Sequence, residues 1–270
     1  MQRGFTLIEA VMVIAITGVV IAMVSIFIAP ATQAYFASNT RAQLTDEADT
    51  ALRRIARDLA GALPNSARIT GQSLELIPVS AAARYAVGTD AADPLLFGTA
   101  DTSFAIVGPA LKLSAGNQRL AWYNLGPGVP DADAYTQANV RVASTAAGSV
   151  NSVAIAGAAL PVSLQAAPYR VYAIEQPVTY RCDTTAGVNT LTRYTGYGFL
   201  ATQPDPPSGG TAAVLARHVQ SCSFSYDVPA IAARYALVTL KLQLGINDAR
   251  NFADRESVTL YHTVHLDNLP

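Results

Sequence analysis

The sequence predicts an α+β protein, in which one long N-terminal helix packs on a head of antiparallel β-sheet. Residues 10–30 carry no charged side chain, and the following residues place apolar side chains every three to four positions, as an amphipathic helix does. From Arg68 onward the hydrophobic period changes to two, and short β-rich runs alternate with Gly, Pro, Asn and Asp. We therefore expect a helical first quarter followed by a β-rich remainder.

The first half of the expected helix, residues 5–29, is apolar enough to span a membrane. A helix from Phe5 to Ala29 would be about 37 Å long at 1.5 Å per residue, whereas a bilayer hydrocarbon core is about 30 Å thick. The run is also longer than the apolar core of a secretory signal peptide, which has roughly 7–15 residues. Arg3 precedes the run and Arg41 is the next basic residue, which favours a cytoplasmic N-terminus.

The second half, residues 30–63, is amphipathic. Charged side chains occupy the face opposite the apolar one, and Asp49 and Arg53 are spaced to form an i,i+4 ion pair. Pro30 removes a backbone donor and predicts a kink. Pro64 predicts the end of the helix, because the residue before a proline avoids the α region. The apolar face consists of Leu44, Ala48, Ala51, Leu52, Ile55, Ala56, Leu59 and Leu63.

Residues 64–270 are expected to form the β-rich head. Its clearest strands are Ser221–Asp227, Leu237–Leu244 and Glu256–Asp267, in which apolar and polar side chains alternate. Such alternation is typical of an antiparallel sheet with one solvated face. The segment between the last two strands, residues 245–255, is expected to be an exposed tip.

The rest of the head is harder to predict. Residues 71–167 match no known pattern, and the stretches 127–167 and 204–210 are loop-like in composition. About 200 residues follow the helix, which indicates one enlarged head rather than a head with a separate binding domain. Further strands are expected at Ser73–Pro78, Arg84–Val87, Phe104–Val107, Arg119–Leu125, Ser149–Ile155, Tyr169–Cys182 and Thr190–Tyr194.

The most informative motif is the segment Arg3-Gly4-Phe5-Thr6-Leu7-Ile8-Glu9 at the start of the apolar run. A carboxylate at the edge of hydrocarbon is costly, so Glu9 is a functional-site candidate. The short charged leader, Gly4, Phe5 and Glu9 at this spacing resemble the processing site of type IV pilins and type II secretion pseudopilins. The resemblance implies that a prepilin peptidase removes residues 1–4, cutting between Gly4 and Phe5, and methylates the new amine of Phe5. It also implies the pilin fold.

The same resemblance implies that Glu9 acts in assembly. After cleavage the Phe5 amine is a cation, and the Glu9 carboxylate of a neighbouring subunit would pair with it in a medium of low dielectric constant. The alternative is a Glu9 side chain that only reaches toward the lipid head groups. The implied partners are the prepilin peptidase, the major and other minor pilins, the inner-membrane assembly platform and the lipid bilayer. The implied location is the inner membrane, crossed once with the head in the periplasm, and then the pilus at the cell surface.

The C-terminal third carries a second resemblance. Residues 213–227, the strand Leu237–Leu244 and the string 263–270 resemble the heads of large minor pilins, closest to the MshO-type biogenesis proteins of the mannose-sensitive haemagglutinin pilus and more distantly J-type pseudopilins. This implies a minor pilin that is incorporated in a type IV pilus or primes its assembly. Two alternatives stay open, namely an adhesin-like binding head displayed by a pilin anchor and a subunit of a type II secretion pseudopilus.

Two cysteines, Cys182 and Cys222, lie on apolar faces of expected strands. An even number of cysteines in a chain exported to an oxidising compartment predicts a disulfide, here closing a loop of about 40 residues. The alternative, a metal-binding or catalytic thiol pair, has the wrong spacing for clustered ligands.

No pattern in the sequence predicts catalysis, so we expect a protein that is not an enzyme and needs no cofactor. The nucleophile, metalloprotease and phosphate-binding motifs are missing. His262 and His265 would point to opposite faces of a strand, which argues against a metal site. The net charge of −1 provides no basic field for nucleic acid.

Overall fold

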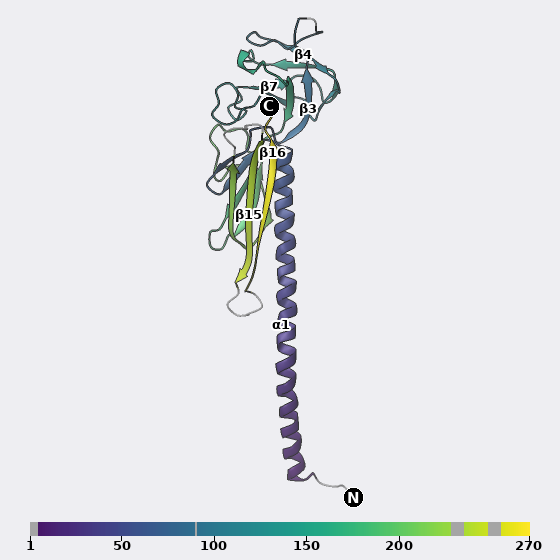
Figure 1. Cartoon of the computed structure of the whole chain (residues 1–270), viewed down its shortest axis with the longest axis vertical. Coiled ribbons are helices and arrows are strands. Elements are labelled where there is room, and N and C mark those ends of the chain that lie inside the picture. The colour runs from purple at the N-terminus through teal and green to yellow at the C-terminus, as the bar shows by residue number, and fades with distance from the viewer. Residues whose placement is uncertain (1–4, 90, 228–234, 248–254) are drawn as a thin grey trace. The chain divides into compact units, whose positions relative to one another are not determined.

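The computed structural model describes residues 5–89, 91–227, 235–247 and 255–270 (Figure 1). The chain is α+β, as predicted: one long helix is followed by antiparallel β-sheets. It divides into two compact units, which we call the helix unit (Met1–Asp46 and Gly245–Val258) and the head unit (Glu47–Leu244 and Thr259–Pro270).

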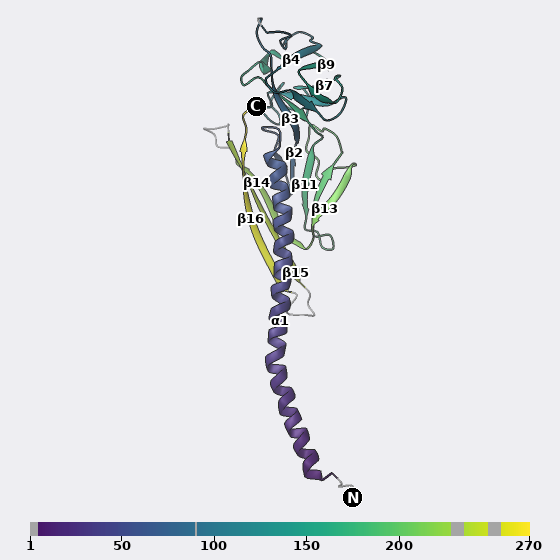
Figure 2. The same cartoon turned by 90° about the vertical axis from the view of Figure 1, so that its right-hand side faces the viewer.

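The helix α1 runs without interruption from Leu7 to Ala60, through Pro30 (Figure 2). It ends three residues before the expected position. The amide of Leu63 donates to the carbonyl of Ile77 at 2.7 Å rather than to the helix. A backbone bond to the sheet thus replaces the last helical turn, while Leu63 stays buried as its place in the apolar pattern predicted.

Within the head unit, the last turns of α1 supply one wall of the core. The expected apolar face is buried except for Ala56, which is half-buried. On the exposed face Asp49 and Arg53 form the predicted ion pair at 2.6 Å. Asp58 reaches the sheet, where its Oδ2 accepts from the Tyr180 hydroxyl at 2.5 Å and from Arg193 at 3.0 Å. The buried helical side chains are Ala48, Ala51, Leu52, Ile55 and Leu59.

Two antiparallel sheets follow the helix in the sequence. The first has five strands in the order β1-β2-β11-β12-β13, and the second has three in the order β14-β15-β16. The alternation predicted for β15 is confirmed, because Val238, Leu240, Leu242 and Leu244 are all buried. The strands are β1 (Arg68–Thr70), β2 (Ser73–Leu76), β11 (Val178–Asp183), β12 (Thr190–Thr195), β13 (Thr211–Ala216), β14 (Val219–Asp227), β15 (Tyr235–Asn247) and β16 (Arg255–Asp267). The tip expected between β15 and β16 lies mostly outside the described residues.

The region without a recognisable pattern forms a closed six-stranded antiparallel barrel in the order β10-β3-β4-β9-β7-β6. Side chains fill its interior, where the rings of Phe104 and Trp122 lie 5.8 Å apart in a T-shaped arrangement. Its strands are β3 (Val79–Tyr85), β4 (Ser103–Val107), β6 (Arg119–Trp122), β7 (Val140–Ala143), β9 (Ser152–Ala156) and β10 (Arg170–Ile174). A small sheet of β5 (Leu111–Leu113) and β8 (Gly148–Val150) and a 3₁₀ turn, η1 (Val162–Leu164), complete this region.

The barrel is an insertion between two neighbouring strands. β2 and β11 pair directly, with Leu76 opposite Val178, although every barrel strand lies between them in the sequence. The chain enters the barrel at Val79 and leaves it at Ile174, and these two residues are themselves cross-strand partners. The five-stranded sheet would therefore keep its order with only a short turn in place of the barrel.

The insertion is fastened to the rest of the head unit by buried polar contacts. Asn124 Nδ2 donates to the carbonyl of Pro64 at 2.7 Å, and the Tyr135 hydroxyl donates to the carbonyl of Ser66 at 2.8 Å. Nearby in the sequence, the buried side chains of Arg68 and Glu75 form an ion pair, with Nε and Oε2 2.5 Å apart. Burial raises the pKa of the Glu75 carboxyl, against the opposing effect of Arg68.

Three expectations for this region were wrong. The stretch 127–167, expected to be a loop, contains β7 and η1, and β3 begins at Val79 rather than Arg84. The run expected at 169–182 is two strands, β10 and β11, which belong to different sheets. Small residues explain the misplaced start of β3, because Ala81, Ala82 and Ala83 carry little β-propensity of their own.

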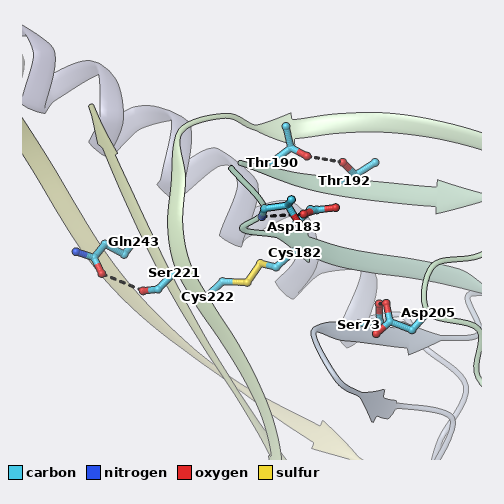
Figure 3. The surroundings of a disulfide bond; sticks show 10 residues. Ser73, Cys182, Asp183, Thr190, Thr192, Asp205, Ser221, Cys222 and Gln243 are labelled. Carbon is cyan, nitrogen blue, oxygen red and sulfur yellow. Dashed lines mark hydrogen bonds between the residues drawn. A yellow bond between two sulfur atoms is a disulfide. The ribbon is translucent and has the colours of Figure 1, made fainter. Parts of the chain in front are cut away.

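The predicted disulfide is confirmed: Cys182 on β11 is bonded to Cys222 on β14, with Cα atoms 6.4 Å apart (Figure 3). The bond joins the five-stranded sheet to the three-stranded sheet. Cys182 is fully buried and Cys222 is half-buried.

Removing this bond should destabilise the protein. The cysteines are 40 positions apart in the sequence, for which the chain-entropy relation gives about 3–4 kcal/mol in the free energy of unfolding. Cys182→Ser with Cys222→Ser should therefore unfold at lower denaturant concentration than the oxidised wild type and close to the reduced wild type. Non-reducing peptide mapping should find the two cysteine peptides linked; free thiols in protein folded in the periplasm would contradict the assignment.

Candidate processing and assembly segment

The candidate site is the start of α1. Gly4 lies outside the described residues, and Phe5, the first described residue, is 79% exposed. The helix begins two residues later, at Leu7. The expected scissile bond, between Gly4 and Phe5, thus lies just ahead of the first helical turn.

Glu9 makes a local contact that the sequence analysis did not anticipate. Its Oε2 accepts from the backbone amide of Thr6 at 3.1 Å and from the Thr6 hydroxyl at 3.1 Å. In return, the amide of Glu9 donates to the Thr6 hydroxyl at 3.4 Å. This reciprocal pattern is a capping box, in which the side chain before the helix and the third helical residue satisfy each other's free amides.

The signal for this cap was present in the sequence. A threonine followed three residues later by glutamate, directly ahead of an apolar run, is the signature of a capping box. Glu9 therefore has a third role beside the two considered from sequence, because it closes the first turn of its own helix. Its Oε1 makes no hydrogen bond among the residues that the structure describes.

The helix that follows is long and apolar enough, by length and composition, to cross a membrane. None of the residues in its most apolar window is buried. Exposed apolar surface on this scale is typical of a segment that is covered by lipid or by other chains. Its large exposed side chains are Leu7, Ile8, Val11, Met12, Val13, Ile14, Ile16, Val19, Val20, Ile21, Met23, Val24, Ile26, Phe27 and Ile28.

The first cation after the apolar run belongs to the helix unit. Arg41 donates to the Glu256 carboxylate of β16 at 2.7 Å, and the Arg41 side chain is 61% exposed. A pair this exposed contributes about 0–1 kcal/mol. It therefore adds little to the stability of the helix unit.

Residues 1–25 match a family model described as the prokaryotic N-terminal methylation motif. The N-terminus carries a prepilin methylation motif. The match covers the charged start, the expected cleavage point, Glu9 and most of the apolar run, and it supports a precursor of the type IV pilin and pseudopilin kind. No curated protein and no solved structure matches the chain.

The methylation motif implies a prepilin peptidase and other pilins as partners. Elsewhere, in the ranges that the structure describes, no three His, Cys, Asp or Glu side chains gather where a metal ion could be held. His262 and His265 are three residues apart on β16, where His262 is half-buried and His265 exposed.

The motif makes Gly4 the residue to test. Gly4→Leu should leave the precursor uncut in the membrane, because a bulky side chain beside the scissile bond blocks the peptidase. Intact-mass measurement of wild type should find residues 1–4 removed and one methyl group on Phe5. Normal maturation of Gly4→Leu, or an uncut wild type, would contradict the prediction; Gly18→Leu, inside the helix, is the matched control and should mature normally.

Proposed function

We propose that this protein is a minor type IV pilin, which is processed by a prepilin peptidase, held in the inner membrane by α1, and incorporated in a pilus or primes its assembly. One observation carries the proposal: the methylation motif is continuous with an uncovered apolar helix, whose other end is buried in a β-rich head. The finer assignment to the MshO type of the mannose-sensitive haemagglutinin pilus rests on residues 213–227 and 263–270. The protein acts as a structural subunit, not as an enzyme.

Assembly replaces lipid around α1 with the helices of neighbouring subunits. Both environments cover the apolar side chains, so the exchange needs a feature that selects one register. The Phe5 amine of one subunit and the Glu9 carboxylate of the next provide it, since a buried charge left without its partner costs about 3–5 kcal/mol.

The capping box is compatible with this pairing. An ionised carboxylate offers about four lone-pair sites on two oxygens. Thr6 occupies only Oε2 of Glu9, so Oε1 remains able to accept from an amine. The cap also limits the rotation of the Glu9 side chain. The carboxylate therefore loses less conformational entropy when it pairs with the Phe5 amine of a neighbouring subunit.

In this proposal the head lies in the periplasm and, after assembly, on the cell surface. The Cys182–Cys222 disulfide supports this side of the membrane, because such bonds form in oxidising compartments. The proposed partners are the major and other minor pilins, the inner-membrane assembly platform and the lipid bilayer.

The barrel favours a second function, an adhesin-like role for the same head. It is inserted into the five-stranded sheet without changing the order of the strands, and it has its own core. A filament subunit needs no such insertion to pack its helix. The barrel therefore supports a binding surface displayed on a pilin scaffold.

Glu9→Ala tests the assembly role. The substitution removes the partner of the neighbouring amine but makes the span more apolar, so membrane insertion should be unharmed. Cleavage should persist because Gly4 is intact, whereas co-purification with other pilins should fall by roughly tenfold or more. Glu9→Asp should be intermediate, since its charge is kept on a shorter side chain. Wild-type filament numbers for Glu9→Ala at equal membrane levels would overturn the proposal.

A further inference from the structure

Two arginines lie directly opposite each other on the outer face of the barrel. Arg84 on β3 and Arg170 on β10 are cross-strand partners. The neighbouring positions Ala83 and Val171 face the interior, so both arginines point outward, and both are exposed. Like charges at directly opposite positions destabilise a sheet.

Among the residues that the structure describes, no carboxylate relieves this repulsion. Neither guanidinium forms an ion pair within the described part of the chain. The neutral Tyr172 hydroxyl lies beside Arg170. Arg68, Arg181 and Arg193 of the head are paired with carboxylates. Arg84 and Arg170 are not, and because they are cross-strand partners, the two together can hold one anion from outside the chain.

The two arginines form one side of a shallow groove. Val107 of β4 lies opposite Arg84 on its other flank, and with Pro109 it forms an apolar wall. The small, exposed side chain of Ala82 leaves the floor of the groove low. The groove has a volume of about 230 Å³, below the roughly 300–1,000 Å³ of sites for drug-sized ligands. It suits one unit of a polymer that carries an anionic group.

The geometry points to an acidic saccharide as the ligand, with its carboxylate or sulfate held between Arg84 and Arg170 and its C–H face against Val107 and Pro109. Arginine forks bind such planar or tetrahedral anions with two hydrogen bonds each. An extended peptide is a poorer fit, because β3 is already paired on both sides, by β10 and β4, and offers no free edge for a peptide backbone. The proposal extends the adhesin-like role, but binding at the groove does not depend on assembly through Glu9.

Binding should be measured by isothermal titration calorimetry on the full protein in detergent micelles. The probe is tetragalacturonate, and its fully methyl-esterified, neutral form is the control ligand. Wild type should bind the acidic form only, and added sodium sulfate should compete. Arg84→Gln and Arg170→Gln should each weaken binding by about 10- to 100-fold, since a charge-assisted hydrogen bond is lost. Arg84→Lys should fall between wild type and Arg84→Gln, because it keeps the charge but loses the fork.

The control variant is Arg57→Gln, which removes an exposed, unpaired arginine from α1 of the same unit. It should bind like wild type. A second readout excludes misfolding: Arg84→Gln should raise the melting temperature by about 1–4 °C, because it removes a repulsive cross-strand pair. A loss of binding accompanied by a lower melting temperature in both glutamine variants would overturn the proposal.

Three further results would also overturn it. They are equal binding of the neutral ester, equal binding of tetraglutamate, and unchanged binding in both glutamine variants. None of them bears on the filament role, which is measured separately by the co-purification of Glu9 variants with other pilins.

Discussion

An apolar helix with no cover of its own is the constraint on which the rest of this molecule depends. Over residues 7–28 nearly every side chain is apolar and exposed, so this part of α1 is stable only inside lipid or among other helices. Glu9 is the only charged side chain between Phe5 and Thr40, and the capping box holds its carboxylate at the first turn.

The opposite end of the same helix is held by ordinary protein packing. Ala48, Ile55 and Leu59 are buried in the head unit, and Asp58 is bonded to Tyr180 and Arg193 of the five-stranded sheet. The disulfide then joins that sheet to the three-stranded one. Together these contacts hold the end of the helix and the two sheets in one packed unit. The barrel is inserted between β2 and β11 and leaves these contacts of the helix in place.

Large apolar side chains were the reason that parts of this fold could be predicted. The alternation of Val238, Leu240 and Leu242 placed β15 correctly, and the helical spacing of Ile55 and Leu59 identified the buried face of α1. The barrel could not be predicted in this way. Its strand β3 contains small residues, and its closure depends on pairings between strands far apart in sequence, such as β3 with β10.

At the site, the positions were predictable but one interaction was overlooked. The spacing of Phe5 and Glu9 indicated processing and assembly. The match over residues 1–25 supports a precursor of the type IV pilin and pseudopilin kind, and the assembly role of Glu9 stays a prediction. The spacing of Thr6 and Glu9 also predicts a capping box. From sequence, Glu9 was interpreted only as a lone carboxylate at the membrane edge, and this contact was not predicted. Because of these hydrogen bonds, a substitution of Glu9 can act in two ways, by removing its charge or by removing the cap of its helix.

The most direct measurement compares Glu9→Gln with Thr6→Val. Glutamine keeps the capping box, because it can accept from Thr6, but it cannot pair with an amine as an ion. Valine at position 6 removes the hydroxyl but leaves the charge of Glu9 intact. With both variants processed and present at equal levels in the membrane, crosslinking to other pilins should fail for Glu9→Gln and persist for Thr6→Val. The reverse result would show that Glu9 serves its own helix and that charge pairing between subunits does not set the register.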